Sequence, residues 1–427
     1  MSSAQKVVEF IAIGREILDG RVIDTNSVWL AQKLKNLGLV LRHAQKVDDE
    51  ISRIIEAFEI ASRRSEIIFV SGGLGPTSDD LTSEAFAKFQ HSEPVLNTEA
   101  EIMVRAWLEK RKRPVNEAQL KQAMLPQGVE VIANNFGTAP AFTFKERTRQ
   151  WFFLPGVPRE LQGIYEEKIQ TQMPKNDDYR HYHWVTQFTA ESALQMDLKD
   201  LISKLPKDFE LAFRTKFPEN YISLFGNLDS PEKIQSFESF KKEITEILAP
   251  STYAHGENTS ELPELFFEKL KSKNIILGFV ESCTGGLNSS RISDISGASE
   301  VLMGSWVTYD NAMKLSLGVS ADLLKSHGAV SEECAREMAL KGYENLKVQF
   351  PESNILVIST TGIAGPNGGT SEKPVGLCHI GLAFGRKLSP IVVETHKVQT
   401  PLTFERLQNK LYFSQKSFTL AMKLIDA

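Results

Sequence analysis

Ser282 lies where its surroundings could make a hydroxyl reactive, in the segment Glu281-Ser282-Cys283-Thr284-Gly285-Gly286. The apolar run 275–280 before it predicts a buried strand, and the two glycines allow the chain to turn into a helix. A side chain at such a turn is exposed at the sheet edge, and the N–H groups of the helix start can receive an oxyanion. The pattern suits acyl transfer, although a serine that only caps a helix is the structural alternative.

A serine nucleophile needs a base, and no histidine lies near Ser282 in the sequence. Lys314 is the candidate, because a lysine acts as a base when burial or a neighbouring cation lowers its pKa. The alternative is an ordinary surface lysine. Cys283 is a rival nucleophile, but a lone cysteine is more often a small buried apolar residue.

A second glycine-rich turn follows the short apolar strand at 67–70. Gly72, Gly73 and Gly75 could approach a phosphate closely, although glycines alone are a weak signal. A helix is predicted to begin near Asp79. Asp79 and Asp80 would then either complement the helix dipole, the interpretation we favour from spacing alone, or hold a divalent cation.

Strand and helix patterns alternate along both ends of the chain. In the first part, strands at 7–13 and 67–70 and helices at 26–37 and from residue 48 predict an α/β domain of three layers with a mainly parallel sheet. Residues 180–250 predict a small α+β domain between linkers at 173–178 and 249–260. The last part has helices at 263–271 and 404–425 and five strands, which predict a C-terminal α/β domain. The expected domains are 1–172, 178–252 and 257–427.

The composition is that of a soluble globular protein. The 427 residues are 41% hydrophobic and 24% charged, and the net charge of −5 gives no basic field for nucleic acid or an anionic membrane. Three cysteines make no disulfide framework and fit a reducing compartment. Residues 1–8 do not form a signal peptide, and no apolar run reaches the ~18 residues of a membrane span. We therefore expect a cytoplasmic protein without membrane or nucleic-acid partners.

Residues 263–425 resemble the CinA C-terminal domain family, whose members are nicotinamide-nucleotide amidases. The resemblance rests on residues 281–286, on Val307-Thr308-Tyr309 with Asn311 and Lys314, and on the segments 327–331, 361–369 and 373–376. It implies deamidation of nicotinamide mononucleotide (NMN), with Ser282 as nucleophile, Lys314 as base and Tyr309 as the partner of the lysine. The oxyanion would be held by N–H groups around Thr284 and Gly285, without metal or organic cofactor.

The phosphate group of such a substrate needs hydrogen-bond donors and positive charges in its binding site. The resemblance favours the glycine-rich loop and the start of the last helix; the expected residues are Thr361, Gly362, Gly365, Gly368, Gly369, Arg406 and Lys410. Glycine lets backbone N–H groups approach an anion, and residues four apart share a helix face. A tight structural turn is the alternative for the glycines. The family usually has arginine at position 410, and lysine keeps the charge but loses the bidentate fork.

Residues 5–170 resemble the domain shared by the N-terminal half of CinA and the molybdopterin-cofactor biosynthesis proteins. The resemblance implies metal-dependent hydrolysis of ADP-ribose, with Co²⁺ or Mg²⁺ on Asp79 and Asp80. The expected nucleotide-binding residues are Glu16, Asp24, Asn26, Gly72, Gly73, Gly75 and Thr77. Arg15 and Ala141 depart from the family pattern, which has a small residue and a glycine there. Arg15 could obstruct the phosphate or bind it.

The two resemblances thus imply an enzyme of pyridine-nucleotide salvage with two activities, acting on NMN and on ADP-ribose, and the family implies a homodimer. Two alternatives stay open. One is a regulatory or binding protein, linked to competence, that keeps the fold without turnover. The other is a molybdopterin-binding module at the N-terminal end. Ammonia release from NMN separates the enzyme from the binding protein.

Overall fold

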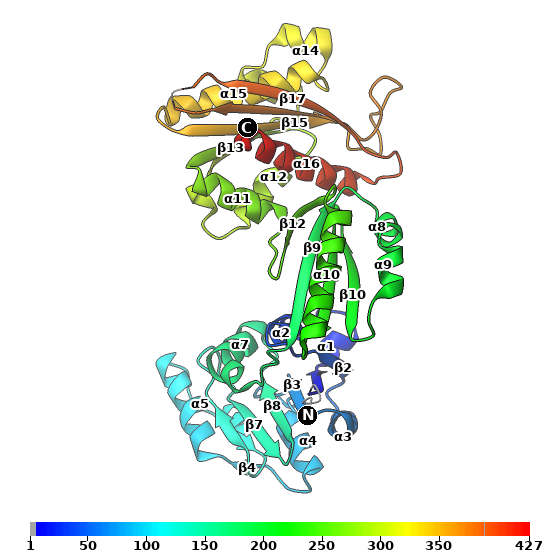
Figure 1. Ribbon diagram of the computed structural model, residues 1–427. Coiled ribbons are helices and arrows are strands. Elements are labelled where there is room, and N and C mark those ends of the chain that lie inside the picture. Colours follow the sequence, from blue (N-terminus) through cyan, green and yellow to red (C-terminus); the bar gives the residue numbers. More distant parts are fainter. Residues whose placement is uncertain (1–5, 388) are drawn as a thin grey trace. The chain divides into compact units, whose positions relative to one another are not determined.

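The computed structural model describes residues 6–387 and 389–427. The chain forms two compact units, one ending at Arg180 and one beginning at His181 (Figure 1). Each unit is a mixture of helices and strands, which confirms the predicted α/β class. Along the described residues, no helix has both the length and the apolar character needed to cross a bilayer.

The first unit is built on a six-stranded sheet of order β2-β1-β3-β8-β7-β6. The first four of these strands run parallel, as predicted, and the last two are antiparallel. The bounds are β1 Val8–Ile13, β2 Leu41–Val47, β3 Ile67–Ser71, β6 Glu130–Ile132, β7 Ala141–Glu146 and β8 Arg149–Leu154. β1 and β3 are buried throughout because both faces of the sheet are covered.

Two apolar clusters make this unit three-layered. One face packs against α2 (Asn26–Lys35) and α7 (Pro158–Ile164), and the other against α3 (Ile51–Arg64), α4 (Thr82–Phe89) and α5 (Thr98–Lys110). Shorter elements complete the unit: α1 Arg15–Leu18, α6 Glu117–Leu120, β4 Val95–Leu96 and β5 Met124–Leu125.

The predicted start of α4 near Asp79 is wrong, because the helix begins at Thr82. The Asp80 carboxylate accepts hydrogen bonds from the N–H and the hydroxyl of Thr77, at 2.8 and 2.6 Å, and so closes a separate turn. Asp79 and Asp80 therefore precede the helix and do not form its first turn.

The second unit begins with a four-stranded antiparallel sheet of order β10-β11-β9-β12. Its bounds are β9 Tyr179–Gln187, β10 Phe209–Lys216, β11 Glu219–Asn227 and β12 Thr252–Gly256, with helices α8 Glu191–Asp197, α9 Lys199–Lys204 and α10 Pro231–Leu248. We call this part the connecting sheet. β12 lies inside the segment 249–260, so the prediction of a linker there is wrong. The Pro, Gly and Asn residues of this segment indicate a linker, whereas the strand forms because it pairs with the distant β9.

The rest of the second unit has a five-stranded sheet of order β14-β13-β15-β16-β17. The bounds are β13 Ile275–Glu281, β14 Leu302–Val307, β15 Asn354–Gly362, β16 Leu377–Gly385 and β17 Val392–Gln399. β14, β13 and β15 are parallel, so their carboxyl ends meet at one edge. One face packs on α11 (Leu262–Ser272), α12 (Leu287–Ser293) and α16 (Arg406–Asp426), and the other on α15 (Glu332–Gln349). α13 (Asn311–Leu317) and α14 (Ala321–His327) follow β14 in the chain.

Candidate functional site

The turn that carries Ser282 is fixed by the residue before it. The Glu281 carboxylate is fully buried and accepts the N–H groups of Gly286, Asn288 and Ser289 at 3.0, 3.1 and 3.0 Å. These are unpaired donors at the start of α12, where a negative charge is favourable. Gly286 has a φ of +92°, which lets the chain reverse at this point. Glu281 thus determines where the hydroxyl of Ser282 lies.

Lys314 lies beside that hydroxyl. Its Nζ is 3.1 Å from Ser282 Oγ and 2.6 Å from the Thr308 carbonyl oxygen, and the residue is 1% exposed. No carboxylate in the described part of the chain forms an ion pair with it. Burial lowers the pKa of Lys314 from the usual 10.5 because the charged form is poorly solvated. The structure brings together the two groups that acyl transfer needs, a hydroxyl and an amine that loses its proton readily.

The two predicted oxyanion donors differ. The Gly285 N–H already donates to the Ser282 carbonyl, at 3.1 Å, so it is not a free donor. The N–H of Thr284 forms no hydrogen bond with any residue that the structure describes. The Thr284 hydroxyl is hydrogen-bonded to that of Thr360 at 2.6 Å, which fixes this residue in the turn. Thr284 is therefore the better donor of the pair.

Tyr309 does not contact Lys314 through its side chain, contrary to its predicted role. The Nζ of Lys314 is 3.5 Å from the Tyr309 backbone carbonyl. The phenol is 59% exposed, and its oxygen accepts a hydrogen bond from Arg406 at 2.7 Å. β14 ends at Val307, so residue 309 lies in the following loop and its ring faces the start of α16.

The start of α16 holds the glycine-rich loop. Arg406 donates to the Gly365 carbonyl at 2.6 Å, and the buried Asn409 donates to the Ala364 carbonyl at 3.0 Å. Lys410 lies near Gly285: its Nζ is 3.9 Å from the position that a Cβ on that glycine would occupy. Lys410 therefore lies over the serine turn, whereas Arg406 joins the glycine loop to Tyr309.

Packing alone explains part of the glycine pattern. A Cβ on Gly362 would lie 2.4 Å from the Leu377 carbonyl oxygen, and one on Gly369 would lie 2.9 Å from the Val375 nitrogen. Thr361 is buried and donates to the Ala329 carbonyl at 2.6 Å. Gly368 is exposed, with a φ of +89° and no backbone atom close to its Cβ position. Gly368 is thus the member of the loop that close packing leaves unexplained.

Cys283 belongs to the apolar core formed with α11, α12 and α16. It is 5% exposed, and its Sγ lies 3.7 Å from that of Cys378, with both thiols free. The residue is therefore a buried apolar neighbour of Ser282.

Sequence reasoning missed Glu281, Thr308 and Asn409 as positioning residues. A carboxylate that ends an apolar strand directly before a Gly-Gly turn was a usable signal for Glu281, because such a group needs partners when buried. Asn409 lies three residues after Arg406 on the same helical face. The role of the Thr308 carbonyl could not be predicted from residue type, because every residue has a backbone carbonyl group.

The first unit has a cavity of about 530 Å³ at the carboxyl ends of β1, β3 and β8. It is lined by the predicted residues Glu16, Asp24, Asn26, Gly72, Gly73, Gly75, Asp79 and Asp80, but not by Thr77. Asp49 and Glu160 add two more carboxyl groups, and no lysine, arginine or histidine is among the described residues of the wall. The cavity is therefore strongly acidic.

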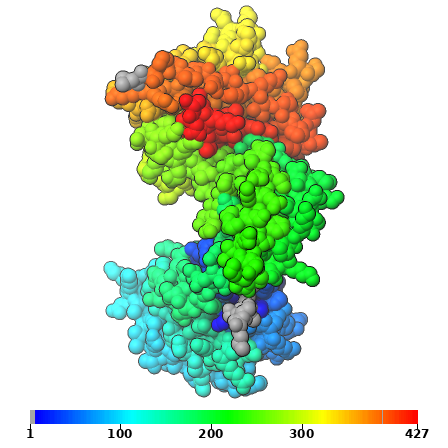
Figure 2. Space-filling model, in the orientation of Figure 1, coloured from blue at the N-terminus to red at the C-terminus, as the bar shows by residue number. Residues whose placement is uncertain are grey.

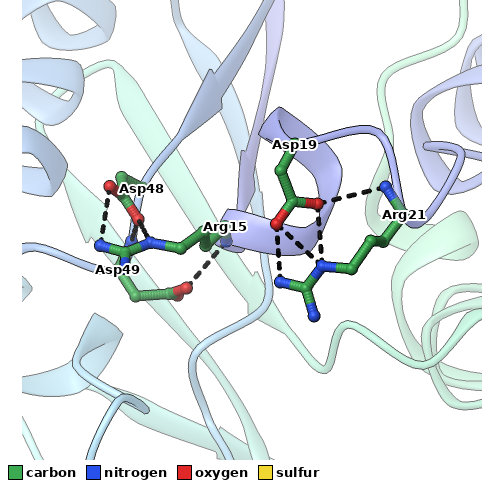
Figure 3. A network of polar contacts seen from close by, with 5 residues as sticks. All are labelled: Arg15, Asp19, Arg21, Asp48 and Asp49. Atoms are coloured by element: carbon green, nitrogen blue, oxygen red, sulfur yellow. Dashed lines mark hydrogen bonds and ion pairs between the residues drawn. The ribbon is translucent and has the colours of Figure 1, made fainter.

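Arg15 turns away from this cavity. Its guanidinium pairs with Asp48 at 2.9 Å, and its backbone N–H donates to Asp49 at 2.8 Å (Figure 3). Arg15 thus neither blocks the cavity nor lines it. Burial, together with Glu16 and Asp79, raises the pKa of Asp49. Ala141, the second departure from the family, is a fully buried core residue of β7.

The negative charge of this cavity suits a divalent cation, but the placement of its carboxylates suits one only in part. The only charged side chains that a pyrophosphate would meet on the described wall are carboxylates, so a cation would have to lie between them. Yet no three His, Cys, Asp or Glu side chains within the described ranges gather closely enough to hold a metal by themselves. Any ion would therefore depend on one or two carboxylates and on ligand oxygens.

Both halves of the chain match known families. Residues 259–425 match the CinA C-terminal domain, and residues 9–175 match the probable molybdopterin binding domain. A protein of Caldicellulosiruptor bescii named for competence-damage induction is 36% identical over 88% of this chain and 90% of its own. A CinA-like protein of Dictyoglomus thermophilum is 34% identical over 89% and 92%.

Among solved structures, the CinA protein of Thermoplasma acidophilum is 31% identical, with a TM-score of 0.38. That match covers 40% of this chain and 100% of the other. The two relatives named above align with most of this chain, and so with parts of both units. The chain belongs to the CinA family.

Proposed function

We propose that the second unit hydrolyses the carboxamide of NMN to nicotinate mononucleotide and ammonia. The observation that carries this proposal is the 3.1 Å contact between Ser282 Oγ and the buried Lys314 Nζ. A desolvated lysine without a carboxylate partner favours its neutral form, which can accept a proton. The choice of substrate rests on the resemblance of residues 263–425 to the CinA C-terminal domain family, whose members are nicotinamide-nucleotide amidases.

The reaction would proceed in two halves. Neutral Lys314 takes the proton of Ser282 as Oγ attacks the carboxamide carbon, and the N–H of Thr284 stabilises the oxyanion. The lysine then gives its proton to the departing nitrogen, so that ammonia leaves and an acyl-enzyme remains. Water attacks this ester with Lys314 again as base, which releases the acid and restores Ser282. The Thr308 carbonyl keeps the amine directed at Oγ throughout.

Two cations are available for the substrate phosphate. Lys410 lies over the serine turn, and Arg406 lies at the glycine loop. The Arg406 guanidinium is occupied by Gly365 and Tyr309, so it would bind phosphate only in addition to these contacts. We therefore assign the larger share of phosphate binding to Lys410. These steps use no metal or organic cofactor.

Ammonia release from NMN by the purified full chain tests this proposal. Ser282→Ala and Lys314→Met should each lower kcat/KM by about 10³-fold or more, because both groups act in one step. Cys283→Ala is the matched control: it changes the adjacent residue, whose thiol faces the core, and should keep activity within about threefold. Equal losses in all three variants, or none in Ser282→Ala, would refute the assignment. Wild type that binds NMN without releasing ammonia would favour the regulatory alternative.

For the first unit we propose metal-dependent hydrolysis of ADP-ribose, because its acidic cavity can accept a pyrophosphate only together with a cation. Asp79 and Asp80 would hold Mg²⁺ or Co²⁺, which would neutralise the phosphate charge. Hydrolysis of ADP-ribose with each ion, and after chelation by EDTA, tests this. Asp80→Asn should abolish the metal-dependent rate. A rate that survives both EDTA and Asp80→Asn would contradict it, and binding of a pterin without hydrolysis would favour a molybdopterin-binding module.

A further inference from the structure

A second cavity of about 360 Å³ lies within the second unit, between the connecting sheet and α16. One wall is formed by Gln187 at the end of β9, by Phe188 and by residues 250–253. The other wall is formed by Lys416, Thr419 and Lys423 of α16. The last turns of α16, drawn in red, lie at the surface in Figure 2. The cavity shares no residue with the serine turn or with the glycine loop, and its volume falls within the ~300–1,000 Å³ range of small-molecule sites.

The helical wall carries two lysines and one aspartate, and so a net positive charge. Lys416 and Lys423 are seven residues apart, two turns of α16, and face the same cavity. Neither forms an ion pair with a residue that the structure describes. Asp426 also lines the cavity, but its carboxylate is held by Lys269 and Lys273 of the neighbouring region. Burial and the charge of Lys423 together lower the pKa of Lys416, as expected of two unneutralised cations.

The opposite wall is strained where it meets Lys416. Phe188 has a φ of +64°, a left-handed conformation that an aromatic residue rarely adopts. Its backbone N–H donates to the Pro218 carbonyl at 3.3 Å, which holds the residue in this conformation. The ring is placed 3.6 Å from the Nζ of Lys416, so it holds the ammonium group by a cation–π contact. Backbone strain of this kind concentrates at sites that clamp a ligand.

We propose that this cavity binds the phosphate group of a small phosphate monoester. Two ammonium groups match a dianion in charge, and lysine binds phosphate as a point charge. Pro250, Leu262 and Met422 give the remainder of the wall an apolar surface that suits the organic part of the ester. Phe188 orients Lys416 towards the ligand. The site is separate from the proposed amidase site and does not depend on its activity.

Equilibrium dialysis of the full chain with radiolabelled inorganic phosphate tests this site. The Arg406→Ala/Lys410→Ala background removes the proposed amidase phosphate site, and EDTA removes metal from the acidic cavity of the first unit. In that background we expect one saturable phosphate per chain. Adding Lys416→Gln and Lys423→Gln should weaken its binding at least tenfold, because both charge-assisted contacts to the phosphate are lost.

The matched control is Lys325→Gln/Lys397→Gln, which removes the same charge at two exposed positions outside the cavity. It should leave the affinity unchanged. Lys416→Arg keeps the charge and should bind phosphate, which separates loss of the site from loss of the fold. Adenosine 5′-monophosphate should displace the phosphate. Absence of saturable binding, equal weakening in the control, or failure of the nucleotide to compete would each overturn the proposal, whatever the ammonia assay gives.

Discussion

Each unit places a glycine-rich turn after a buried parallel strand, but the two turns collect opposite chemistry. After β13, Ser282 meets the buried amine of Lys314, and Lys410 lies above the turn. After β3, residues 71–76 line a cavity whose wall carries carboxyl groups and, among its described residues, no lysine, arginine or histidine. The backbone motif, a buried strand followed by a glycine-rich turn, is the same in both units.

The difference lies in side chains that come from other elements. α13 places Lys314 beside Ser282. The carboxylate of Glu281 accepts hydrogen bonds from the start of α12, so the serine turn has no free carboxylate from this residue. In the first unit, the segments around α1 and β2 bring Glu16, Asp24 and Asp49 to the turn. A strand, a glycine turn and a helix therefore specify where chemistry can happen, and the partners specify which chemistry.

The largest expected effect concerns the pair in the serine turn. If Ser282 and Lys314 act as one unit, Ser282→Ala/Lys314→Met should be no slower than the worse single variant, with each about 10³-fold or more below wild type. The measurement is kcat/KM for ammonia release from NMN. Losses that multiply in the double variant would mean that the two groups act independently, and the comparison between the turns would lose its basis.

The next effect concerns the capping carboxylate. Glu281→Gln replaces an acceptor of three backbone N–H groups with an amide whose NH₂ faces those donors. We expect kcat/KM to fall by about 10²-fold, because Ser282 is displaced relative to Lys314, and the free energy of unfolding to fall by ~1–3 kcal/mol. Glu300→Gln, at an exposed position of the same domain, should change neither quantity. A stable Glu281→Gln enzyme with wild-type activity would show that the cap does not position the serine.

Much of this arrangement could be predicted from the sequence, and the rest depended on contacts between distant residues. Apolar runs that lead into glycine-containing segments predicted β1, β13 and β15. Spacing alone favoured an ordinary cap and a surface lysine, and the resemblance to the CinA C-terminal domain family implied that Ser282 and Lys314 act together. Residue type did not predict that Tyr309 turns towards Arg406, since a loop residue can face either way. β12 was missed because its partner β9 lies more than sixty residues earlier in the sequence. The start of α4 was misplaced because Thr77 and Asp80 close a turn of their own.

A smaller effect follows from the lowered pKa of Lys314. The base must be uncharged, so kcat/KM should rise with pH through the pKa of Lys314 in the folded protein and then level off. The unfolded chain binds this proton up to a pKa of about 10.5, whereas the folded protein releases it at lower pH. Stability therefore increases with pH between those two values, and below them the buried charge is destabilising.

Lys314→Met removes that buried charge, so the inactive variant should be more stable than wild type by about 1 kcal/mol near pH 6. The difference should shrink as pH rises towards about 10, which guanidinium melts at several pH values would measure. Lys325→Met, at an exposed position, is the control and should show no such trend. A difference that does not change with pH would mean that Lys314 is not desolvated in the folded protein.

The smallest expected effect concerns Arg15, and it tests whether the acidic cavity of the first unit lacks a cation. Arg15 is the cation nearest in sequence to Glu16, yet its side chain is 68% exposed and is paired with Asp48 outside the acidic cavity. Because an exposed pair of this kind contributes little, Arg15→Ala should change the KM for ADP-ribose by less than about twofold. Asp80→Asn, which should abolish the metal-dependent rate, is the control for loss of the reaction itself. A tenfold rise in KM for Arg15→Ala would mean that the guanidinium leaves Asp48 to bind the pyrophosphate, and that the first unit supplies a cation of its own when ligand is present.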